Sequence, residues 1–432
     1  MGAGADRMRV VIVGAGFGGL SAAMALEKAP VDLTVIDQHN YHLFQPLLYQ
    51  VATAALSPAD IAAPIRGVLR QQKNARVLLD QVTGVDPAAR QVHTRDRRSI
   101  PYDALIIGTG ARHSYFGRDD WAADAPGIKT IDDATMVRRR VLMAFERAEQ
   151  ATDKAEREAH LTFVIVGGGP TGVEMAGAIA ELAHKTIVAD FRSITAHCAR
   201  VVLVEAGDRL LAAFPPDLSE SARTGLKRLG VEVRTGCRVE EVTAAGVRMG
   251  GAFLPARTTL WAAGVRASAA GEWLGAATDR VGRVVVEPDF SVPGHADIFV
   301  IGDTAAYTVP GTATVLPGIA PVAKQAGHWV GALIASRARG APPPRPFRYR
   351  DWGNLATIGR QDAVVAMGGV HIRGLAAWLL WGVAHVWFLI GFRNRFVVAA
   401  SWLWSYLTYQ RGVRLITGGA PAVPAPQQKE AA

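Results

Sequence analysis

Two groups of glycines in this chain have the spacing that nucleotide phosphates require. The first group follows residues 10–13, a β-branched run that suits a strand buried on both faces. It reads G-x-G-x-x-G, with Gly14, Gly16 and Gly19. Such glycines permit a tight turn, leave room for a pyrophosphate and let a helix pack closely on the strand. Residues 20–28 predict that helix, whose N-terminus would offer free N–H groups to the phosphates.

An acidic residue completes this unit. The segment "DLTVID" predicts a second strand that ends at Asp37, where a carboxylate can accept hydrogen bonds from ribose hydroxyls. Strand, helix, strand and terminal acid together predict a dinucleotide site far more specifically than the glycines alone. The alternative is a glycine-rich turn in an unrelated α/β protein.

The same design recurs in the middle of the chain, after a strand predicted at residues 163–166. The glycines of this copy are Gly167, Gly169 and Gly172. The matching acid, Glu205, lies further on than usual, which predicts a longer helical excursion through residues 175–199. Because a carboxylate repels the 2′-phosphate of NADPH, the sequence favours NADH, although Arg209 is a nearby cation.

Three later strands run into turns that could complete these sites. Residues 102–112, "YDALIIGTGAR", and 258–266, "TTLWAAGVR", each lead a strand into a small-residue glycine turn, the second at Gly264. Each is expected to close its own nucleotide domain. The segment 295–306 predicts a strand that ends at Asp303. Behind two glycine motifs this aspartate is interpreted as the partner of a flavin ribityl chain, whereas alone it would suit a helix N-cap.

Length, charge and cysteine content narrow the class of protein. A chain of 432 residues is too long for one ordinary core, so two or three domains are expected. The net charge of +9 suggests an anionic partner, and nothing resembles a nucleic-acid-binding module. Cys198 and Cys237 form no CxxC pair, which excludes a redox dithiol beside a flavin. The histidines lack metal-ligand spacing and no Ser–His–Asp triad is recognisable, so any redox chemistry would rest on cofactors and no metal is expected.

The C-terminal part is apolar and rich in tryptophan. Residues 374–392 contain no formally charged side chain and are long enough to cross a bilayer, but the next apolar segment, 396–409, is too short to return. Tryptophan and tyrosine suit the headgroup boundary. Arginines bracket both segments: Arg373, Arg393, Arg395, Arg411 and Arg414. We therefore expect residues 370–418 to form a monotopic anchor on anionic lipid. The alternatives are a dimer interface or a buried core helix.

Taken together, the chain resembles the flavoproteins with two dinucleotide-binding domains, and more closely the type II NADH dehydrogenases, which are non-proton-pumping NADH:quinone oxidoreductases. The resemblance spans roughly residues 8–418. Its most specific piece is "NYHLFQPLLYQVATAALSP" at 40–58, which general flavin reductases do not share. The segments "LPGIAPVAKQAGHWVG" at 316–331 and "YRDWGNLATIGRQDAVV" at 349–365 add to it.

The resemblance implies FAD in the first copy of the nucleotide fold and NADH in the second. The residues expected to hold FAD are Gly14, Gly16, Phe17, Gly18, Gly19, Asp37, Val82 (through its backbone), Thr109, Gly110, Asp303 and Ala320. Those expected to hold NADH are Gly167, Gly169, Pro170, Thr171, Gly172, Glu205 and Gly264.

Two residues are implied in catalysis. Glu174 would lie near the nicotinamide and the flavin, where it positions NADH or helps to move a proton; a first-turn carboxylate favoured by the helix dipole is a compatible alternative. Quinone is expected where the helix containing Ala320 and Gln325 meets the flavin. Many relatives have glutamine where this chain has Pro321, which leaves Gln325 as the side-chain donor to a quinone oxygen. His42, in "NYHLF", is expected to be packed or hydrogen-bonded near the flavin rather than catalytic.

The expected fold is therefore α/β, with two Rossmann-like domains, one inserted in the other, and a C-terminal amphipathic helical module. The expected parts are an FAD domain at 1–115 and 292–345, an NADH domain at 116–291, a C-terminal module at 346–418 and a disordered tail at 419–432. The protein is expected to be a homodimer on the cytoplasmic face of the inner membrane. Deleting residues 370–432 is expected to release it and to spare NADH oxidation by a soluble acceptor.

Three functions remain open on these residues. The first is transfer of two electrons from NADH to a membrane quinone. The second is reduction of another acceptor, such as a soluble protein partner or the substrate of a sulfide:quinone-type relative, although sulfur chemistry requires more cysteines than this chain has. The third is a non-enzymatic NADH-sensing flavoprotein.

Overall fold

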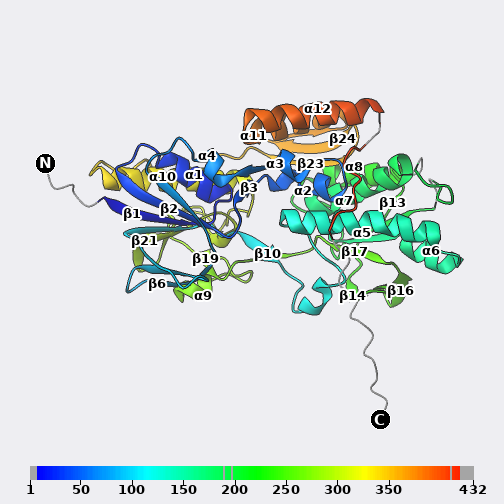
Figure 1. Cartoon of the computed structure of the whole chain (residues 1–432), viewed down its shortest axis with the longest axis horizontal. Coiled ribbons are helices and arrows are strands. Elements are labelled where there is room, and N and C mark those ends of the chain that lie inside the picture. Colours follow the sequence, from blue (N-terminus) through cyan, green and yellow to red (C-terminus); the bar gives the residue numbers. More distant parts are fainter. Residues whose placement is uncertain (1–6, 188–189, 196–197, 409–410, 419–432) are drawn as a thin grey trace, which may run out of the picture.

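The computed structural model describes residues 7–187, 190–195, 198–408 and 411–418, so the tail at 419–432 lies outside the described residues. Figure 1 shows an elongated molecule with the strands of the first nucleotide fold at one end and those of the second at the other. Helices α11 (Leu375–Phe388) and α12 (Phe392–Thr408) lie side by side along one long edge.

The first nucleotide fold is built on a sheet in the order β20-β21-β9-β1-β2-β5. All neighbours are parallel except β20 and β21. The strands are β1 (Met8–Val13), β2 (Val31–Asp37), β5 (Ala75–Leu79), β9 (Ala104–Ile107), β20 (Ser291–Val292) and β21 (His295–Val300). Helices α1 (Phe17–Ala25) and α10 (Ala320–Ala338) pack against each other beside this sheet. The first glycine motif thus joins the central strand to α1.

The second nucleotide fold repeats the arrangement with a parallel sheet in the order β13-β12-β11-β17. Its strands are β11 (Thr162–Val166), β12 (Arg200–Val204), β13 (Val231–Arg234) and β17 (Thr258–Trp261). Helix α7 (Pro170–Glu181) follows β11 as α1 follows β1. The two parallel sheets predicted from the glycine motifs are therefore confirmed.

Smaller elements connect and decorate these folds. Each fold carries a three-stranded antiparallel sheet, β6 (Val82–Asp86), β7 (Gln91–Thr94) and β8 (Ser99–Pro101) in the first, and β14 (Val239–Thr243), β15 (Gly246–Met249) and β16 (Ala252–Pro255) in the second. The antiparallel pair β10 (Ala111–His113) and β18 (Val265–Ala267) joins the two folds. The remaining strand pairs are β3 (Tyr41–Leu43) with β4 (Ala62–Pro64) and β19 (Val284–Val285) with β22 (Ala305–Ala306). The remaining helices are α2 (Leu48–Ala52), α3 (Pro58–Ile61), α4 (Ile65–Val68), α5 (Ile131–Gln150), α6 (Lys154–His160), α8 (Pro216–Arg228) and α9 (Ala270–Leu274).

The C-terminal module is an antiparallel sheet with two helices. Its strands are β23 (Asn354–Gly359), β24 (Asp362–Met367) and β25 (Val370–Arg373), followed by α11 and α12. Strand β23 packs directly against α7. The contact is so close that a Cβ atom at Gly177 would overlap the carbonyl oxygen of Ile358. Glycine at this position therefore lets the module approach the second nucleotide fold at backbone distance.

Residues 44–61 do not pack with the first sheet. Buried side chains of this segment, such as Phe44 and Leu48, share one apolar core with the second nucleotide fold and with Trp381 of α11. The first sheet has a core of its own. A segment expected within the FAD domain thus fills the space between the second nucleotide fold and the C-terminal module.

The helical excursion expected through residues 175–199 is confirmed as far as Thr186 and wrong for the described residues beyond it. Helix α7 ends at Glu181 and continues as one π-helical turn, Leu182–Thr186, after which the described residues are irregular. The polar side chains that follow favour turns over helix. The backbone N–H groups of Arg192 and Ser193 donate to the Glu149 carboxylate of α5, which fixes this stretch as a loop.

Candidate functional site

The two glycine loops have the same backbone geometry. Gly14 has a φ of +93° and Gly167 a φ of +113°, a region that favours glycine. A Cβ atom at Gly19 would overlap the carbonyl oxygen of Gly14, and one at Gly172 would overlap that of Gly167. The first and third glycines of each motif are therefore needed for the turn itself.

The middle glycine of each motif faces open space. A Cβ atom at Gly16 or at Gly169 would meet nothing within 4 Å. These residues are the N-caps of α1 and α7, and neither helix has a side-chain cap on its first N–H groups. Uncapped N–H groups beside open space suit the phosphates of a dinucleotide, so both loops fit the groups predicted for them.

A carboxylate brackets each loop in the same way. Asp37 accepts from the backbone N–H of Ala15 at 2.6 Å and from that of His39 at 2.7 Å. Glu205 accepts from the N–H of Gly168 at 2.5 Å and from that of Gly207 at 2.7 Å. Both acids therefore lie at the mouth of their loop, where a ribose would follow the phosphates.

The other residues expected around FAD lie near the first loop. Gly110 donates its N–H to the Thr304 hydroxyl at 2.8 Å, and the Thr109 hydroxyl lies 2.5 Å from that of Ser268. Asp303, beside Thr304 in the 3₁₀ turn Gly302–Thr304, has a raised pKa because it is buried. Val82 is buried at the start of β6.

Helix α10 lies on the first loop at backbone distance. A Cβ atom at Gly327 would overlap the carbonyl oxygen of Gly18, and Ala320 begins the helix. Phe17, at the start of α1, touches His42 edge-on with ring centres 5.1 Å apart. His42 is buried and its Nδ1 lies 2.9 Å from the carbonyl oxygen of Ala15, which confirms a packed and hydrogen-bonded histidine beside this loop.

The residues expected around NADH surround the second loop. Pro170 occupies the first position of α7, where a missing N–H costs nothing, and Thr171 follows it. Gly264 lies just beyond β17 with a φ of +75°. The Arg209 guanidinium donates to the carbonyl oxygens of Phe214 and Ala212 at 2.7 and 2.8 Å. The cation nearest Glu205 in the sequence is thus engaged with backbone.

Glu174 is buried in the second turn of α7, near its N-terminus. Its side chain is 9% exposed, and its Oε1 accepts from the backbone N–H of Thr357 on β23 at 3.4 Å. Burial raises the pKa of Glu174 to about 8. At neutral pH this carboxyl group therefore carries a proton that it can give up, as a general acid requires.

Glu174 lies at one end of a cavity of about 130 Å³. The elements that line it come from four distant parts of the chain: α2, α7, β23 and the helix pair α11–α12. The aromatic part of the lining consists of Tyr49, Trp378, Trp381, Trp402 and Tyr406, and the ionisable part of Glu174, Glu181, Lys185, Arg360 and Arg411. A cavity with both kinds of lining suits a small amphipathic guest or water.

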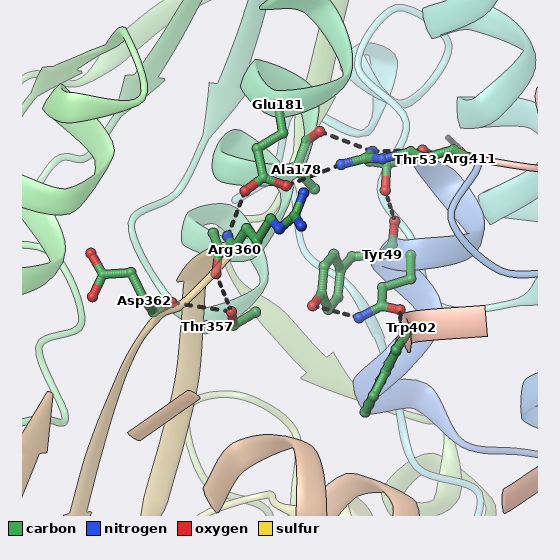
Figure 2. Close-up of polar contacts among 11 residues, drawn as sticks. Tyr49, Thr53, Ala178, Glu181, Thr357, Arg360, Asp362, Trp402 and Arg411 are labelled. Atoms are coloured by element: carbon green, nitrogen blue, oxygen red, sulfur yellow. Dashed lines mark hydrogen bonds and ion pairs between the residues drawn. The ribbon is translucent and has the colours of Figure 1, made fainter. Parts of the chain in front are cut away.

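An ion pair between Arg411 and Glu181 lies in the lining of this cavity, and Figure 2 shows its hydrogen bonds. Arg411 donates from Nη1 to the carbonyl oxygens of Thr53 and Ala178, and from Nη2 to Glu181 at 3.2 Å. The other oxygen of Glu181 accepts from the backbone N–H of Arg360. Arg411 was expected on the lipid surface, but the structure buries it, because three acceptors inside the protein, the carbonyl oxygens of Thr53 and Ala178 and the Glu181 carboxylate, bind its guanidinium. Similarly, Arg414 pairs with Asp190.

A hydrogen-bond chain forms another wall of the cavity. Trp402 of α12 donates from Nε1 to Gln50 Oε1 at 2.7 Å, and Gln50 Nε2 donates to the Tyr49 hydroxyl oxygen at 3.0 Å. Because an indole N–H can only donate, the Gln50 amide must present its oxygen to Trp402 and its nitrogen to Tyr49. The Tyr49 hydroxyl therefore accepts this bond and keeps its own proton for another partner.

Gln325 is already engaged. Its Nε2 donates to the carbonyl oxygen of Arg350 at 2.9 Å, and its Oε1 accepts from the N–H of Arg350 at the same distance. These two bonds use one N–H and the oxygen of the amide. Lys324, next to it, lies 4.8 Å above the Phe388 ring of α11, and burial lowers the pKa of this lysine.

Helices α11 and α12 expose an apolar stripe. Leu375, Leu379, Val383 and Trp387 repeat every four residues on α11 and are each more than half exposed. The matching set on α12 comprises Phe392, Phe396, Leu403, Trp404 and Leu407. Among the residues that the structure describes, no helix combines the length and apolar character that crossing a bilayer requires. An exposed apolar face of this kind is typical of a surface that contacts another protein or a membrane.

Sequence reasoning missed several residues of the site. Tyr49 and Gln50 lie within the most specific segment, yet no role was assigned to them. The signal available for α7 was helical spacing, because Glu174, Ala178 and Glu181 share one face at i, i+4 and i+7. No local sequence pattern indicates that residues of α11 and α12 would line the same cavity.

Comparison with known proteins agrees with this geometry. The family model for pyridine nucleotide-disulphide oxidoreductases matches residues 8–327. The chain is 45% identical to the type II NADH:quinone oxidoreductase NdhA of Mycobacterium tuberculosis, a match that covers 95% of this chain and 90% of that protein. The type II NADH:quinone oxidoreductase Ndh of the same organism is 44% identical over the same shares. The structure of NDH2 from Plasmodium falciparum in complex with NADH has a TM-score of 0.85 at 19% identity and covers 95% of this chain and 100% of that one.

The disulphide in the family's name does not apply to this chain. Cys198 and Cys237 are free and lie 39 positions apart in the sequence. The match over most of the chain and the 45% identity across nearly all of it lead to one assignment. The chain belongs to the pyridine nucleotide-disulphide oxidoreductase family and, within it, to the type II NADH:quinone oxidoreductases.

Proposed function

We propose that the chain holds FAD in its first nucleotide fold and binds NADH in its second nucleotide fold. It transfers two electrons from NADH to a membrane quinone without pumping protons. The observation that carries this is the matched pair of loops, each with an uncapped helix N-terminus, open space at its middle glycine and a carboxylate at its mouth. A bound flavin supplies the two-electron chemistry. The protein binds and orients the nucleotides and supplies protons.

The preference for NADH over NADPH rests on Glu205 and Arg209. The Glu205 carboxylate lies where the ribose is expected and would repel a 2′-phosphate. Arg209 could neutralise that phosphate only by giving up its two backbone carbonyl partners. The second nucleotide site is therefore built for the unphosphorylated ribose.

Glu174 is proposed to act at the nicotinamide and Gln325 at the quinone. Glu174 is buried, protonated at neutral pH and held by the N–H of Thr357, so it supplies a proton near the nicotinamide. Gln325 has one N–H left for a quinone oxygen and is fixed in orientation by Arg350. The FAD domain is assigned to 1–115 and 292–345, the NADH domain to 116–291 and the C-terminal module to 346–418.

The apolar stripe of α11 and α12 is proposed to lie on the membrane that contains the quinone. Aromatic and aliphatic side chains on one helix face, with Arg373, Arg393 and Arg395 exposed beside them, suit an interfacial position on anionic lipid. The homodimer and the cytoplasmic face of the inner membrane stay predictions. Light scattering of the detergent-purified chain tests the first and protease accessibility in oriented vesicles the second.

The deciding experiment is anaerobic stopped-flow of the detergent-purified chain with flavin absorbance as the readout. Fast bleaching by NADH, weak bleaching by NADPH and rapid recovery with a short-chain ubiquinone are expected. Bleaching without recovery would remove the quinone from the proposal. Release from membranes by high salt alone would instead favour a soluble protein acceptor.

A further inference from the structure

Reduction of a quinone by NADH takes up one proton from solvent. The balanced reaction is NADH + H⁺ + quinone → NAD⁺ + quinol, in which NADH is oxidised, the quinone is reduced and two O–H bonds form. The hydride lost by NADH accounts for two electrons and one of the two hydrogens. The second proton must reach a site from which water is largely excluded. The inference below rests on the proposed function and concerns the route of that proton.

The cavity beside α7 joins Glu174 to the protein surface. Glu174, Ala178 and Glu181 form one stripe of its lining, about 10 Å long at 1.5 Å per residue. Glu174 is buried at the inner end, the Glu181 side chain is 20% exposed, and Lys185, one turn further, is exposed. A volume of about 130 Å³ has room for several water molecules.

Glu181 and Tyr49 are two lining residues that could carry a proton toward Glu174, and their hydrogen bonds differ. Glu181 is fixed by Arg411 on one oxygen and by the N–H of Arg360 on the other, so its carboxylate serves as an ion-pair partner. The Tyr49 hydroxyl accepts from Gln50 and retains a proton to donate. Tyr49 is 5% exposed and lines the same cavity as Glu174. Burial raises the pKa of the Tyr49 phenol, with a smaller contribution from Glu174, so the phenol keeps its proton at neutral pH.

We propose that Tyr49 relays protons from water in this cavity to Glu174. In each relay step a cavity water between the two groups gives a proton to the Glu174 carboxylate and takes the Tyr49 proton in its place. The phenol then recovers a proton from a hydronium ion that enters the cavity from solvent, so one solvent proton is consumed per step. Gln50, fixed by Trp402, holds the phenol oxygen in place. Tyr49 thus acts through Glu174, while Gln50 and Trp402 position it.

Other charges face the same space and must be considered in any pH profile. The titratable or charged groups that line the cavity with Glu174 are Tyr49 from α2, Glu181 and Lys185 from α7 and its π-helical turn, Arg360 after β23, Tyr406 from α12, and Arg411. A variant that removes only a hydroxyl, or only fills space, leaves these charges unchanged. Tyr49→Phe and Ala178→Leu meet that condition.

The experiment compares two electron acceptors in the full-length, flavin-loaded protein. Short-chain ubiquinone needs the solvent proton, whereas ferricyanide accepts electrons alone. Because general acid–base groups contribute about 10²- to 10⁴-fold and cavity water can partly replace a phenol, Tyr49→Phe should lower kcat with ubiquinone about tenfold. Its solvent deuterium isotope effect on that kcat should rise. Its ferricyanide rate and its flavin bleaching by NADH should stay at the parent level.

Two further variants make the comparison decisive. Ala178→Leu fills the cavity between Glu174 and Glu181 and should give the same pattern as Tyr49→Phe. Tyr307→Phe removes another buried phenol, which lies outside the cavity lining and donates to the Pro288 carbonyl oxygen. This variant should change the rate with neither ubiquinone nor ferricyanide. An unchanged ubiquinone rate and isotope effect in the two cavity variants would overturn the relay. A parallel loss with ferricyanide would also overturn it, because that loss would be structural.

The proposed function fails differently. A parent protein that reduces ferricyanide with NADH but never ubiquinone would refute the quinone acceptor. A parent protein that reduces both acceptors, with cavity variants that match it, would refute only the Tyr49 relay.

Discussion

At the scale of single residues, burial decides what Glu174 can do. The first-turn carboxylate expected from sequence is wrong, because Glu174 lies in the second turn of α7, where the helix dipole has little effect. The C-terminal module covers the residue, and the N–H of Thr357 donates to its carboxylate. Desolvation outweighs this hydrogen bond, so the pKa of Glu174 rises from 4.5 to about 8.

This shift predicts a pH-dependent gain from Glu174→Gln. Between pH 4.5 and about 8 the unfolded chain has lost the proton that the folded chain keeps, so the free energy of unfolding falls as pH rises through this window. The amide removes that loss and keeps the acceptor for Thr357. The Tm of the variant should therefore match the parent near pH 4 and exceed it most above about pH 8. A Tm difference that stays constant with pH would contradict the raised pKa.

At the scale of elements, the contact between β23 and α7 sets the position of the C-terminal module. Gly177→Ala should gain about 1 kcal/mol of helix propensity but lose about 1–3 kcal/mol to overpacking, because the overlapping atom is a backbone carbonyl that cannot move alone. A lower Tm is expected. Gly84→Ala, where a Cβ meets nothing within 4 Å, is the matched control and should leave the Tm unchanged. Equal behaviour of the two variants would mean that β23 adjusts freely.

The stripe on α11 and α12 predicts a specific defect in membrane binding. Each exposed aliphatic side chain moved into lipid contributes about 1.5–3 kcal/mol, so Leu379→Gln with Val383→Gln should weaken binding to anionic vesicles by tenfold or more. Leu79→Gln removes an equally exposed leucine from β5 and should bind as the parent does. Sedimentation with vesicles gives the comparison, and identical binding by both proteins would rule out the stripe as the lipid contact.

At the scale of the whole molecule, the C-terminal module is part of the catalytic body. Ala377 and Trp381 of α11 lie in the same apolar core as the second nucleotide fold. The ring of Phe44 contacts that of His385, with ring centres 6.1 Å apart. The His385 ring in turn contacts that of Trp381, with ring centres 4.2 Å apart. Contrary to the separable anchor expected from sequence, we therefore expect deletion of residues 370–432 to expose this core.

Two truncations test this integration without removing the helices. A chain that ends at residue 410 lacks Arg411 and leaves Glu181 partly buried without that partner, which typically costs about 3–5 kcal/mol. It should unfold at a clearly lower temperature. A chain that ends at residue 418 keeps the ion pair and serves as the control. If both truncations melt with the full-length protein, the C-terminal segment does not stabilise the catalytic body.

The sequence by itself determined the nucleotide folds. The glycine spacings, the β-branched runs and the acids Asp37 and Glu205 are local patterns, each confined to a few consecutive elements. Steric limits act within those elements, so Gly14 and Gly167 adopt the left-handed backbone that their motifs predict. The resemblance to type II NADH dehydrogenases rested on equally local segments.

Only the tertiary structure decided where the remaining residues act. The cavity combines α2, α7, β23, α11 and α12, and its hydrogen bond between Gln50 and Trp402 joins residues 352 positions apart. Arg411 was expected to face lipid because it follows an apolar segment, yet the Thr53 carbonyl and two acceptors on α7, the Ala178 carbonyl and the Glu181 carboxylate, bind it inside the protein. Local patterns specify which segment becomes a helix or a strand. Which buried polar groups find partners depends on packing between distant segments, and that packing buries Glu174 and gives Tyr49 and Arg411 their hydrogen-bond partners.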